Sequence, residues 1–375
     1  MRTYVRYGAR LVIVQKVVMP ATGVVSFTVL GDDLAPVEAA ERYLAHLSGI
    51  ERSPNTVRAY AHGLKLWLEF LAPRQVDWDA AGVEDVSGFV SWLRCPDQNV
   101  IVLDANAGQR SAATVNRHLA AVFGFYDFHA RSGVELAASL VAWRRVSRGS
   151  YKPFLHHVTK GRPIPTRPIK LKVAKRIPCT LTDEELRAIL ADCERLRDRF
   201  LLVLLMETGM RVGQALGLRH ADFSSRSREV AIVPRADNAN GARAKCSKVS
   251  VIPVSTGLVR LYSDYMHTEY GTLDSDYVFV NLFAEPRGRP LRYHAVARLV
   301  SRIRKRTGIT FTLHTLRHTR ATELIRKGVA IEVVSKLLTH SSVATTSQAY
   351  VHLEAEDLRV QLVATGIWDG ERGTP

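Results

Sequence analysis

The sequence LHTLRHTRATELIRKG, at residues 313–328, is the most informative stretch of this chain. We predict a helix over residues 313–327, on which His314 and Arg317 share one face because they stand three positions apart. An imidazole beside a guanidinium is an odd pairing unless an anion lies between them. A phosphate would satisfy both, since each can donate hydrogen bonds to its oxygens. A lone His-x-x-Arg motif is a weak signal, so its meaning depends on other residues.

The sequence TGMRVG places Arg211 between two apolar stretches. A buried arginine is costly unless it meets an anion. The ordinary explanation is a structural salt bridge to Glu207 or Asp222. For this residue taken alone, that explanation would be the better one.

Three further residues of the second half are ordinary when taken one at a time. Lys245 lies near the turn between two predicted strands, residues 229–234 and 249–254, where a lysine is usually just exposed. His340 follows an apolar stretch, and Tyr350 stands ten residues later. A single tyrosine is more often a core or surface aromatic than a nucleophile.

The set is more specific than its members, because Arg, Lys, His-x-x-Arg, His and Tyr follow in this order. Together they would surround one phosphodiester with hydrogen-bond donors and no carboxylate. Divalent metals prefer oxygen ligands, so we expect no metal at this site. No nucleotide or other cofactor is expected either. Fixed donors suit the charge of a pentavalent phosphorane, and Tyr350 can then act as the covalent nucleophile.

Four segments resemble, in sequence, order and spacing, the boxes of tyrosine recombinases of the phage-integrase family. The resemblance covers residues 181–352 well and extends more weakly to residues 36–130, which are similar to the family's helical core-binding domain. The four segments are ETGMRVGQALGLRHADF (207–223), KCSKVSVIPV (245–254), LHTLRHTRATELIRKG (313–328) and LLTHSSVATTSQAYVH (337–352).

The resemblance implies a role for each of the six residues. Tyr350 attacks the scissile phosphate and forms a 3′-phosphotyrosine, which frees a 5′-hydroxyl. Arg211 and Arg317 clamp the non-bridging oxygens. The remaining three follow from the same match: His340 donates to the phosphate, His314 assists as general acid/base or by positioning, and Lys245 protonates the leaving oxygen.

The chain departs from the family pattern at several places. Thr339 stands where the family usually has glycine, and Gln214 where it usually has glutamate. Tyr350 follows His340 by ten residues instead of the usual nine.

The hairpin before Lys245 also carries an insertion, residues 237–244. This makes Lys248 a rival for the lysine role. We prefer Lys245 because its distance to Pro253 matches the family.

The predicted fold class is mainly α with small β elements (α+β). It comprises a helical core-binding (SAM-like) domain and an integrase-type catalytic domain that form a C-shaped clamp around DNA. Capping signals place two helix starts, Ser53-Pro54 and the capping box of Thr182 with Glu185. The predicted divisions are a β-rich segment (1–33), the helical domain (34–143), a basic Pro-rich linker (144–180), the catalytic domain (181–352) and a C-terminal tail that could dock on a partner (353–375).

Excess positive charge points to a polyanionic partner, because the net charge is +16 and the isoelectric point about 9.9. Residues 144–180 hold eleven Lys/Arg, five Pro and no Asp or Glu. A solvated linker would normally carry acids, so an extended strap along a phosphate backbone explains this segment better. The candidate DNA contacts are Arg58, His62, Lys65, Asn116, Arg117, Arg144, Arg145, Lys160, Arg162, Lys170, Lys172, Lys175 and Lys248.

Double-stranded DNA is preferred over a membrane surface as the partner. The longest apolar runs, such as Phe200–Met206, are far shorter than a spanning helix requires, and the N-terminal sequence lacks the pattern of a signal peptide. Four scattered cysteines argue against a zinc site or a disulfide framework. We expect a cytoplasmic bacterial protein associated with the nucleoid. The family resemblance implies a homotetramer on two duplexes.

Three functions remain open from the residues. A site-specific recombinase, integrase or transposase is preferred. A type IB topoisomerase-like enzyme would use the same chemistry, with rotation in place of strand exchange. A DNA-binding protein with a decayed site would have lost one of the six residues, and all six are present.

Overall fold

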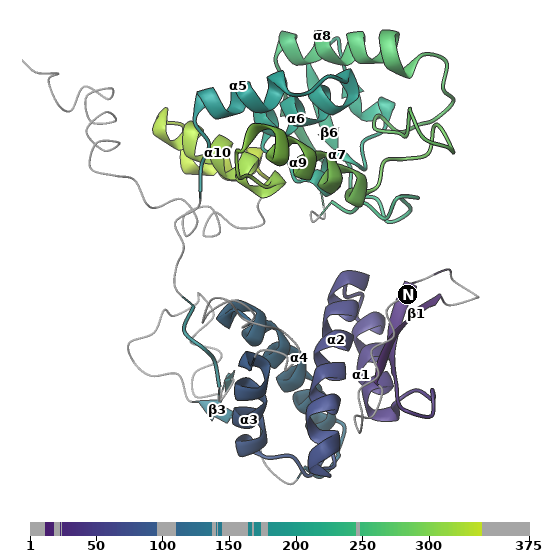
Figure 1. The fold of residues 1–375 in the computed structure, drawn as a ribbon, viewed down its shortest axis with the longest axis vertical. Helices are drawn as coiled ribbons and strands as arrows, with labels where there is room; N and C mark the ends of the chain where they lie inside the picture. Colours follow the sequence, from purple (N-terminus) through teal and green to yellow (C-terminus); the bar gives the residue numbers. More distant parts are fainter. Residues whose placement is uncertain are drawn as a thin grey trace, which may run out of the picture. The chain divides into compact units, whose positions relative to one another are not determined.

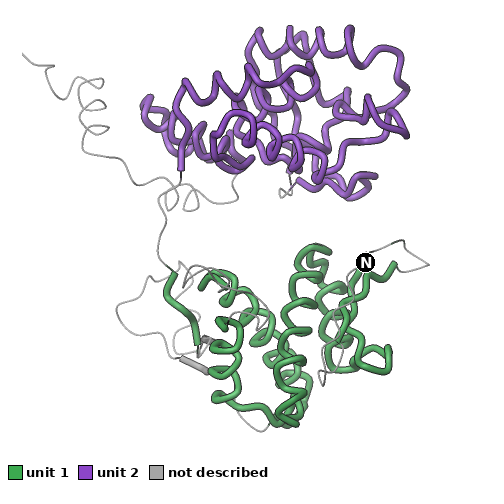
Figure 2. The backbone as a smooth tube through the Cα atoms, viewed as in Figure 1, with its two compact units in different colours: residues 1–175 green, residues 176–375 purple. Residues whose placement is uncertain are grey.

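The chain folds into two compact units, residues 1–175 and 176–375 (Figure 2). The computed structural model describes residues 12–18, 23, 25–95, 110–136, 140, 142–144, 164–166, 169–173, 179–244 and 248–339. The boundary between the units lies inside the basic segment 144–180. No helix within the described ranges is long and apolar enough to cross a membrane.

The first unit is a helical bundle with a β hairpin on its side (Figure 1). Its long helix α2 begins as the sequence predicts, because the Ser53 hydroxyl accepts a hydrogen bond from the Thr56 N–H (3.2 Å) and Pro54 follows. Its elements are β1 (Ile13–Val18), β2 (Val25–Leu30), α1 (Glu38–Gly49), α2 (Pro54–Leu71), the 3₁₀ turn η1 (Ala72–Arg74), α3 (Val83–Arg94), α4 (Ala112–Arg131), β3 (Ala142–Arg144) and β4 (Ile164–Thr166).

An aromatic chain of hydrogen bonds lies at the centre of this unit. Trp67 on α2 is fully buried, and its indole N–H donates to the Tyr126 hydroxyl on α4 (3.0 Å). That hydroxyl donates in turn to the carbonyl oxygen of Trp78 (2.5 Å). The Trp67 N–H, the Tyr126 hydroxyl and the Trp78 carbonyl are therefore all hydrogen-bonded, as polar groups in a core must be.

The hairpin β1–β2 belongs to the same core. The strands pair antiparallel, with Ile13 opposite Leu30. Val29 is fully buried, and its carbonyl accepts from the Val37 N–H (2.8 Å) just before α1. The described residues of the hairpin therefore form a ribbon that packs on its own domain rather than a separate arm.

Part of the basic segment is fastened to the first unit. Strands β3 and β4 pair antiparallel, which agrees with the extended conformation predicted there. Further on, the Asn116 side chain on α4 accepts from the Leu171 N–H and donates to the Leu171 carbonyl, both at 2.9 Å. Leu171 also packs against the apolar core of the unit. Residues 169–173 are thus docked on the helices rather than forming a loose connector.

The second unit encloses the buried helix α6 between a small sheet and further helices (Figure 1). The sheet has the antiparallel order β5-β6-β7, with Val230 opposite Ile252. Its elements are α5 (Asp183–Ala191), α6 (Leu196–Thr208), α7 (Val212–Ala215), the 3₁₀ turn η2 (His220–Asp222), β5 (Phe223–Ser224), β6 (Glu229–Ile232), β7 (Ser250–Pro253), α8 (Thr256–Tyr265), the π-helical turn η3 (Met266–Tyr270), α9 (Tyr293–Thr307), α10 (Leu313–Arg326) and α11 (Ile331–Leu337).

Helix starts in the second unit follow the sequence signals. The capping box is confirmed, because Thr182 and Glu185 exchange side chain to backbone hydrogen bonds at 2.9 and 3.2 Å. Helix α6 contains the apolar run Phe200–Met206 and ends at Gly209, whose φ of +64° is the left-handed conformation that favours glycine.

We predict that Tyr126→Phe destabilises the first unit by about 1–3 kcal/mol, because it leaves the buried Trp67 N–H and the Trp78 carbonyl without their partner. Urea unfolding followed by tryptophan fluorescence measures this, since four of the five tryptophans precede residue 176. Tyr60→Phe is the matched control, because no hydrogen bond of the Tyr60 hydroxyl is found among the described residues. Equal stability of the two variants would contradict the prediction.

Candidate active site

Arg317 is the most deeply buried charged residue of the predicted set, with 2% of its surface exposed. Its guanidinium donates from Nη1 to the Gly209 carbonyl (2.8 Å) and from Nη2 to the Leu338 carbonyl (2.6 Å). These carbonyls belong to the turn before Arg211 and to the end of α11, before His340. Arg317 therefore draws together the two segments that carry other predicted site residues.

Arg211 lies at the start of α7, where its backbone N–H donates to the Gln214 side-chain oxygen (2.7 Å). Its Nη1 lies 3.4 Å from the Thr339 hydroxyl, directly beyond the Leu338 carbonyl that Arg317 binds. The two arginines thus meet the same turn at the end of α11.

The carboxylates weighed as salt-bridge partners for Arg211 are bonded elsewhere. Glu207 accepts hydrogen bonds from the backbone N–H and hydroxyl of Ser255, at the start of α8. Asp222 accepts two bonds from Arg235, at 2.6 and 2.7 Å. Neither Glu207 nor Asp222 is therefore the salt-bridge partner expected for a purely structural Arg211.

Two glycines permit the close packing around Arg211. A Cβ on Gly209 would lie 2.6 Å from a methyl carbon of Leu338, and one on Gly213 would lie 2.7 Å from the Arg243 carbonyl oxygen. The second approach brings the β6–β7 connection against the helix that follows Arg211. Lys245, two residues after Arg243, lies outside the described residues.

His314 lies in the first turn of α10, and its ring meets that of His318 edge to face at 4.3 Å between centroids. Loss of water around the ring, then the charges of Arg317 and Arg211, lower the pKa of His314 from its ordinary value of 6.5. Burial, then the neighbours His314 and Arg317, lowers the pKa of His318 to about 4. Both imidazoles are therefore neutral at pH 7.

The structure describes Arg211, His314 and Arg317 of the six predicted catalytic residues and brings them together. His340 and Tyr350 lie outside the described residues, as Lys245 does. The rival Lys248 is described and exposed.

The predicted DNA contacts on α2 and α4 form one basic patch, which comprises Arg58, His62, Lys65 and Arg117. Loss of water around its ring, and then the positive charges of Arg58, Lys65 and Arg117, lower the pKa of His62. The three basic side chains therefore lie close to the His62 ring. Lys65 also pairs with Glu69 (3.0 Å). Asn116, by contrast, is engaged with Leu171 and serves the fold.

The other predicted contacts lie in the basic segment. Lys170 and Lys172 are exposed on the docked residues 169–173. Arg144 lies on β3, where only the backbone is described. Four predicted contacts lie outside the described residues: Arg145, Lys160, Arg162 and Lys175.

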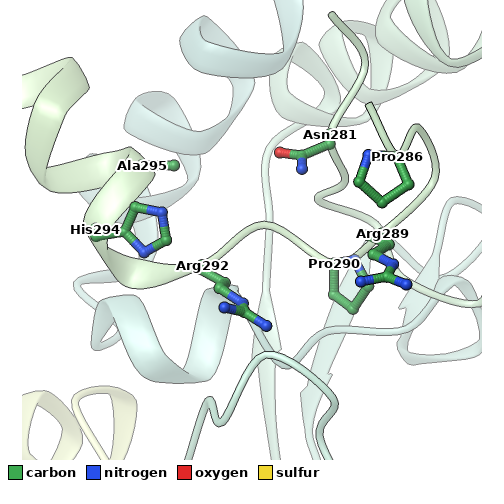
Figure 3. A pocket seen from close by; sticks show the side chains of 7 residues that line it. All are labelled: Asn281, Pro286, Arg289, Pro290, Arg292, His294 and Ala295. Carbon is green, nitrogen blue, oxygen red and sulfur yellow. The ribbon is translucent and has the colours of Figure 1, made fainter. Parts of the chain in front are cut away.

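A basic pocket of about 240 Å³ was missed by the sequence analysis (Figure 3). It lies where the chain enters α9, and three of its side chains are basic: Arg289, Arg292 and His294. No acidic side chain lines it. The sequence PRGRPLRYH, residues 286–294, could have indicated it by its density of basic residues.

Comparison with known proteins identifies the family of this chain. Residues 180–357 match the model of the phage integrase family, and residues 40–133 match that of the phage integrase N-terminal SAM-like domain. The chain belongs to the phage integrase family. It is therefore a DNA-cleaving and rejoining enzyme of the recombinase and transposase kind. These matches do not favour the topoisomerase-like alternative.

The chain is similar to two groups of relatives. Transposase A from transposon Tn554 of Staphylococcus aureus is 39% identical over 335 residues, which cover 89% of this chain and 92% of the relative. Tyrosine recombinase XerC of Nitrobacter winogradskyi is 28% identical, with coverage of 84% and 89%.

Solved structures confirm the mainly helical integrase fold. The Tn1549 transposon integrase, solved with circular intermediate DNA, aligns with a TM-score of 0.59 at 15% identity, covering 86% of this chain and 98% of that one. A lambda integrase dimer on a core site aligns with a TM-score of 0.55 at 16% identity, with coverage of 83% and 94%.

We predict that the second unit loses stability as the pH falls from about 6.5 toward 4. In this range the unfolded His318 ring binds a proton while the folded ring, with a pKa of about 4, does not, so protons favour the unfolded state. This contribution is fully present above pH 6.5. Urea midpoints at pH 7.5, 6 and 5 should fall more steeply for the wild type than for His318→Gln. Parallel declines would show that His318 does not carry the effect.

Proposed function

We propose that this enzyme is a transposase or site-specific recombinase that cleaves DNA through Tyr350. The observation that carries the proposal is the contact of Arg211 with Thr339 and of Arg317 with Leu338, the two residues just before His340. Such an arrangement of fixed donors suits the charge that develops on a phosphate under attack. Similarity to transposase A of Tn554 over most of both chains supports transposition in particular.

The proposed reaction exchanges one phosphoester for another. The Tyr350 phenolic oxygen transfers its proton to a general base, the role that neutral His314 can fill, and bonds to phosphorus as the bond to the 5′-oxygen breaks. The departing 5′-oxygen takes a proton from Lys245 and leaves as a hydroxyl. The enzyme keeps the 3′-phosphate as a tyrosyl ester, so religation to another 5′-hydroxyl needs no nucleotide.

The remaining residues stabilise the phosphate in this proposal. Arg211, Arg317 and His340 donate to its non-bridging oxygens. His314 is neutral at pH 7 because of its lowered pKa, so it can both accept and donate a hydrogen bond. It therefore positions the phosphate or relays a proton without adding charge.

DNA binding would involve both units. We propose that each unit contacts double-stranded DNA, the first through the basic patch on α2 and α4 and the second through the pocket before α9. Four protomers on two duplexes would form the complex that exchanges strands. The solved structures of the Tn1549 integrase and the lambda integrase, each with DNA, support a DNA partner for this fold.

We predict that Tyr350→Phe abolishes the covalent adduct but preserves DNA binding, because phenylalanine lacks the nucleophilic oxygen. The assay uses the full chain and a duplex from the DNA flanking its gene, nicked close to the crossover so that cleavage is trapped. Tyr293→Phe, at an exposed tyrosine on α9, is the control and should form the adduct as the wild type does. An adduct with Tyr350→Phe would refute the assignment.

We predict that Lys245→Ala slows cleavage about 100-fold or more, because the 5′-oxygen loses its acid. A substrate with sulfur in place of this 5′-oxygen should react at nearly the wild-type rate, since a thiolate leaves without a proton. Lys248→Ala is the matched control, with little change on either substrate. If Lys248→Ala instead shows the slow rate and the sulfur rescue, the lysine role belongs to residue 248.

A further inference from the structure

Two of the departures from the family pattern, Gln214 and Thr339, are in direct contact. The Gln214 side-chain nitrogen donates to the Thr339 hydroxyl oxygen at 2.8 Å, although 125 positions separate them. Both residues are buried, with 2% and 8% of their surfaces exposed. The contact lies against Arg211, whose Nη1 is 3.4 Å from the same hydroxyl oxygen.

The direction of each hydrogen bond is fixed. The Gln214 oxygen accepts from the Arg211 backbone N–H at 2.7 Å, so the amide nitrogen must face Thr339. Amide and guanidinium nitrogens only donate, and a hydroxyl oxygen has two lone pairs. Thr339 therefore uses both lone pairs as an acceptor, and its proton points elsewhere. Among the described residues it meets no acceptor.

The backbone at Thr339 is costly for its residue type. Its φ is +54°, a conformation that a β-branched residue rarely adopts and that glycine adopts freely. Such conformations persist where the surroundings hold them, and they cluster at functional sites. The hydroxyl is the only polar group of the Thr339 side chain. It is therefore the only group of this side chain that could give the strained position a function.

We propose that the Thr339 hydroxyl donates to a non-bridging oxygen of the DNA phosphate that Arg211 holds, and that Gln214 aims it. This rests on the proposed function. A glutamate at position 214 would instead accept the hydroxyl proton and remove the donor. Thr339 is then a phosphate ligand of this enzyme, and Gln214 is a positioning residue.

The test compares Thr339→Val, which keeps the shape and loses the hydroxyl, with Thr339→Ser, which keeps the hydroxyl. Single-turnover cleavage of the nicked duplex should slow roughly 10-fold or more for Thr339→Val and stay near the wild-type rate for Thr339→Ser, as expected for loss of one hydrogen bond to a charged group. A second substrate carries a methyl group in place of one non-bridging oxygen, as separate stereoisomers. On the isomer that lacks the oxygen bound by Thr339, the wild type and Thr339→Val should react at equal rates.

Gln214→Glu supplies an independent measurement. In an otherwise wild-type enzyme, Gln214→Glu should slow cleavage of the phosphodiester, because the glutamate accepts the Thr339 hydroxyl proton. When Thr339→Gly is also present, Gln214→Glu should slow cleavage much less, because no hydroxyl remains to be redirected from the phosphate. The proposal is overturned if Thr339→Val matches the wild type on the phosphodiester, or if it is slowed equally on both methyl isomers. Absence of any Tyr350-dependent adduct from the wild type would instead overturn the proposed function.

Discussion

The buried guanidinium of Arg317 is the interaction on which the active-site geometry depends. It joins the carbonyls of Gly209 and Leu338, which lie 129 positions apart and lead into Arg211 and His340. Hydrogen bonds to a charged group are each worth roughly 1.5–3 kcal/mol, and the cost of removing either acceptor is larger in a buried setting. An ammonium could not replace the guanidinium, because its donors are not arranged in a planar fork. One side chain thus fixes the spacing of two catalytic segments.

Much of the fold could be predicted from local sequence signals. The predicted helix over residues 313–327 agrees with α10 to within a residue, and the apolar patterns of α9 and α11 are as regular. Periodic apolar residues mark these helices, and a glycine or a capping residue marks several of their ends. The bounds of helix α6 could not be predicted in this way, because apolar residues surround it and give no stripe. Helix α8 was missed although Ser255 caps its first turn.

The site was only partly predictable, for a physical reason. A set of donors without carboxylates indicated a phosphate, and the order of the residues indicated the family. The contacts that hold the set are pairs distant in sequence, such as Asn116 with Leu171 and Gln214 with Thr339. Propensity and periodicity report on neighbours along the chain, so they contain no information on these pairs. The sequence therefore predicts Asn116 only as a candidate DNA contact and gives no sign that its amide binds the backbone of Leu171.

The neutral rings of His314 and His318 have a consequence for the conditions under which the enzyme works. Among the described groups of the site, only the guanidiniums carry charge near neutrality, and they keep their protons at every physiological pH. If these described groups bind a nucleic-acid phosphate as proposed, their own contribution to binding changes little with acidity in this range. Small ions compete for the same phosphate, so the salt concentration of the cell is the variable that weakens these particular contacts.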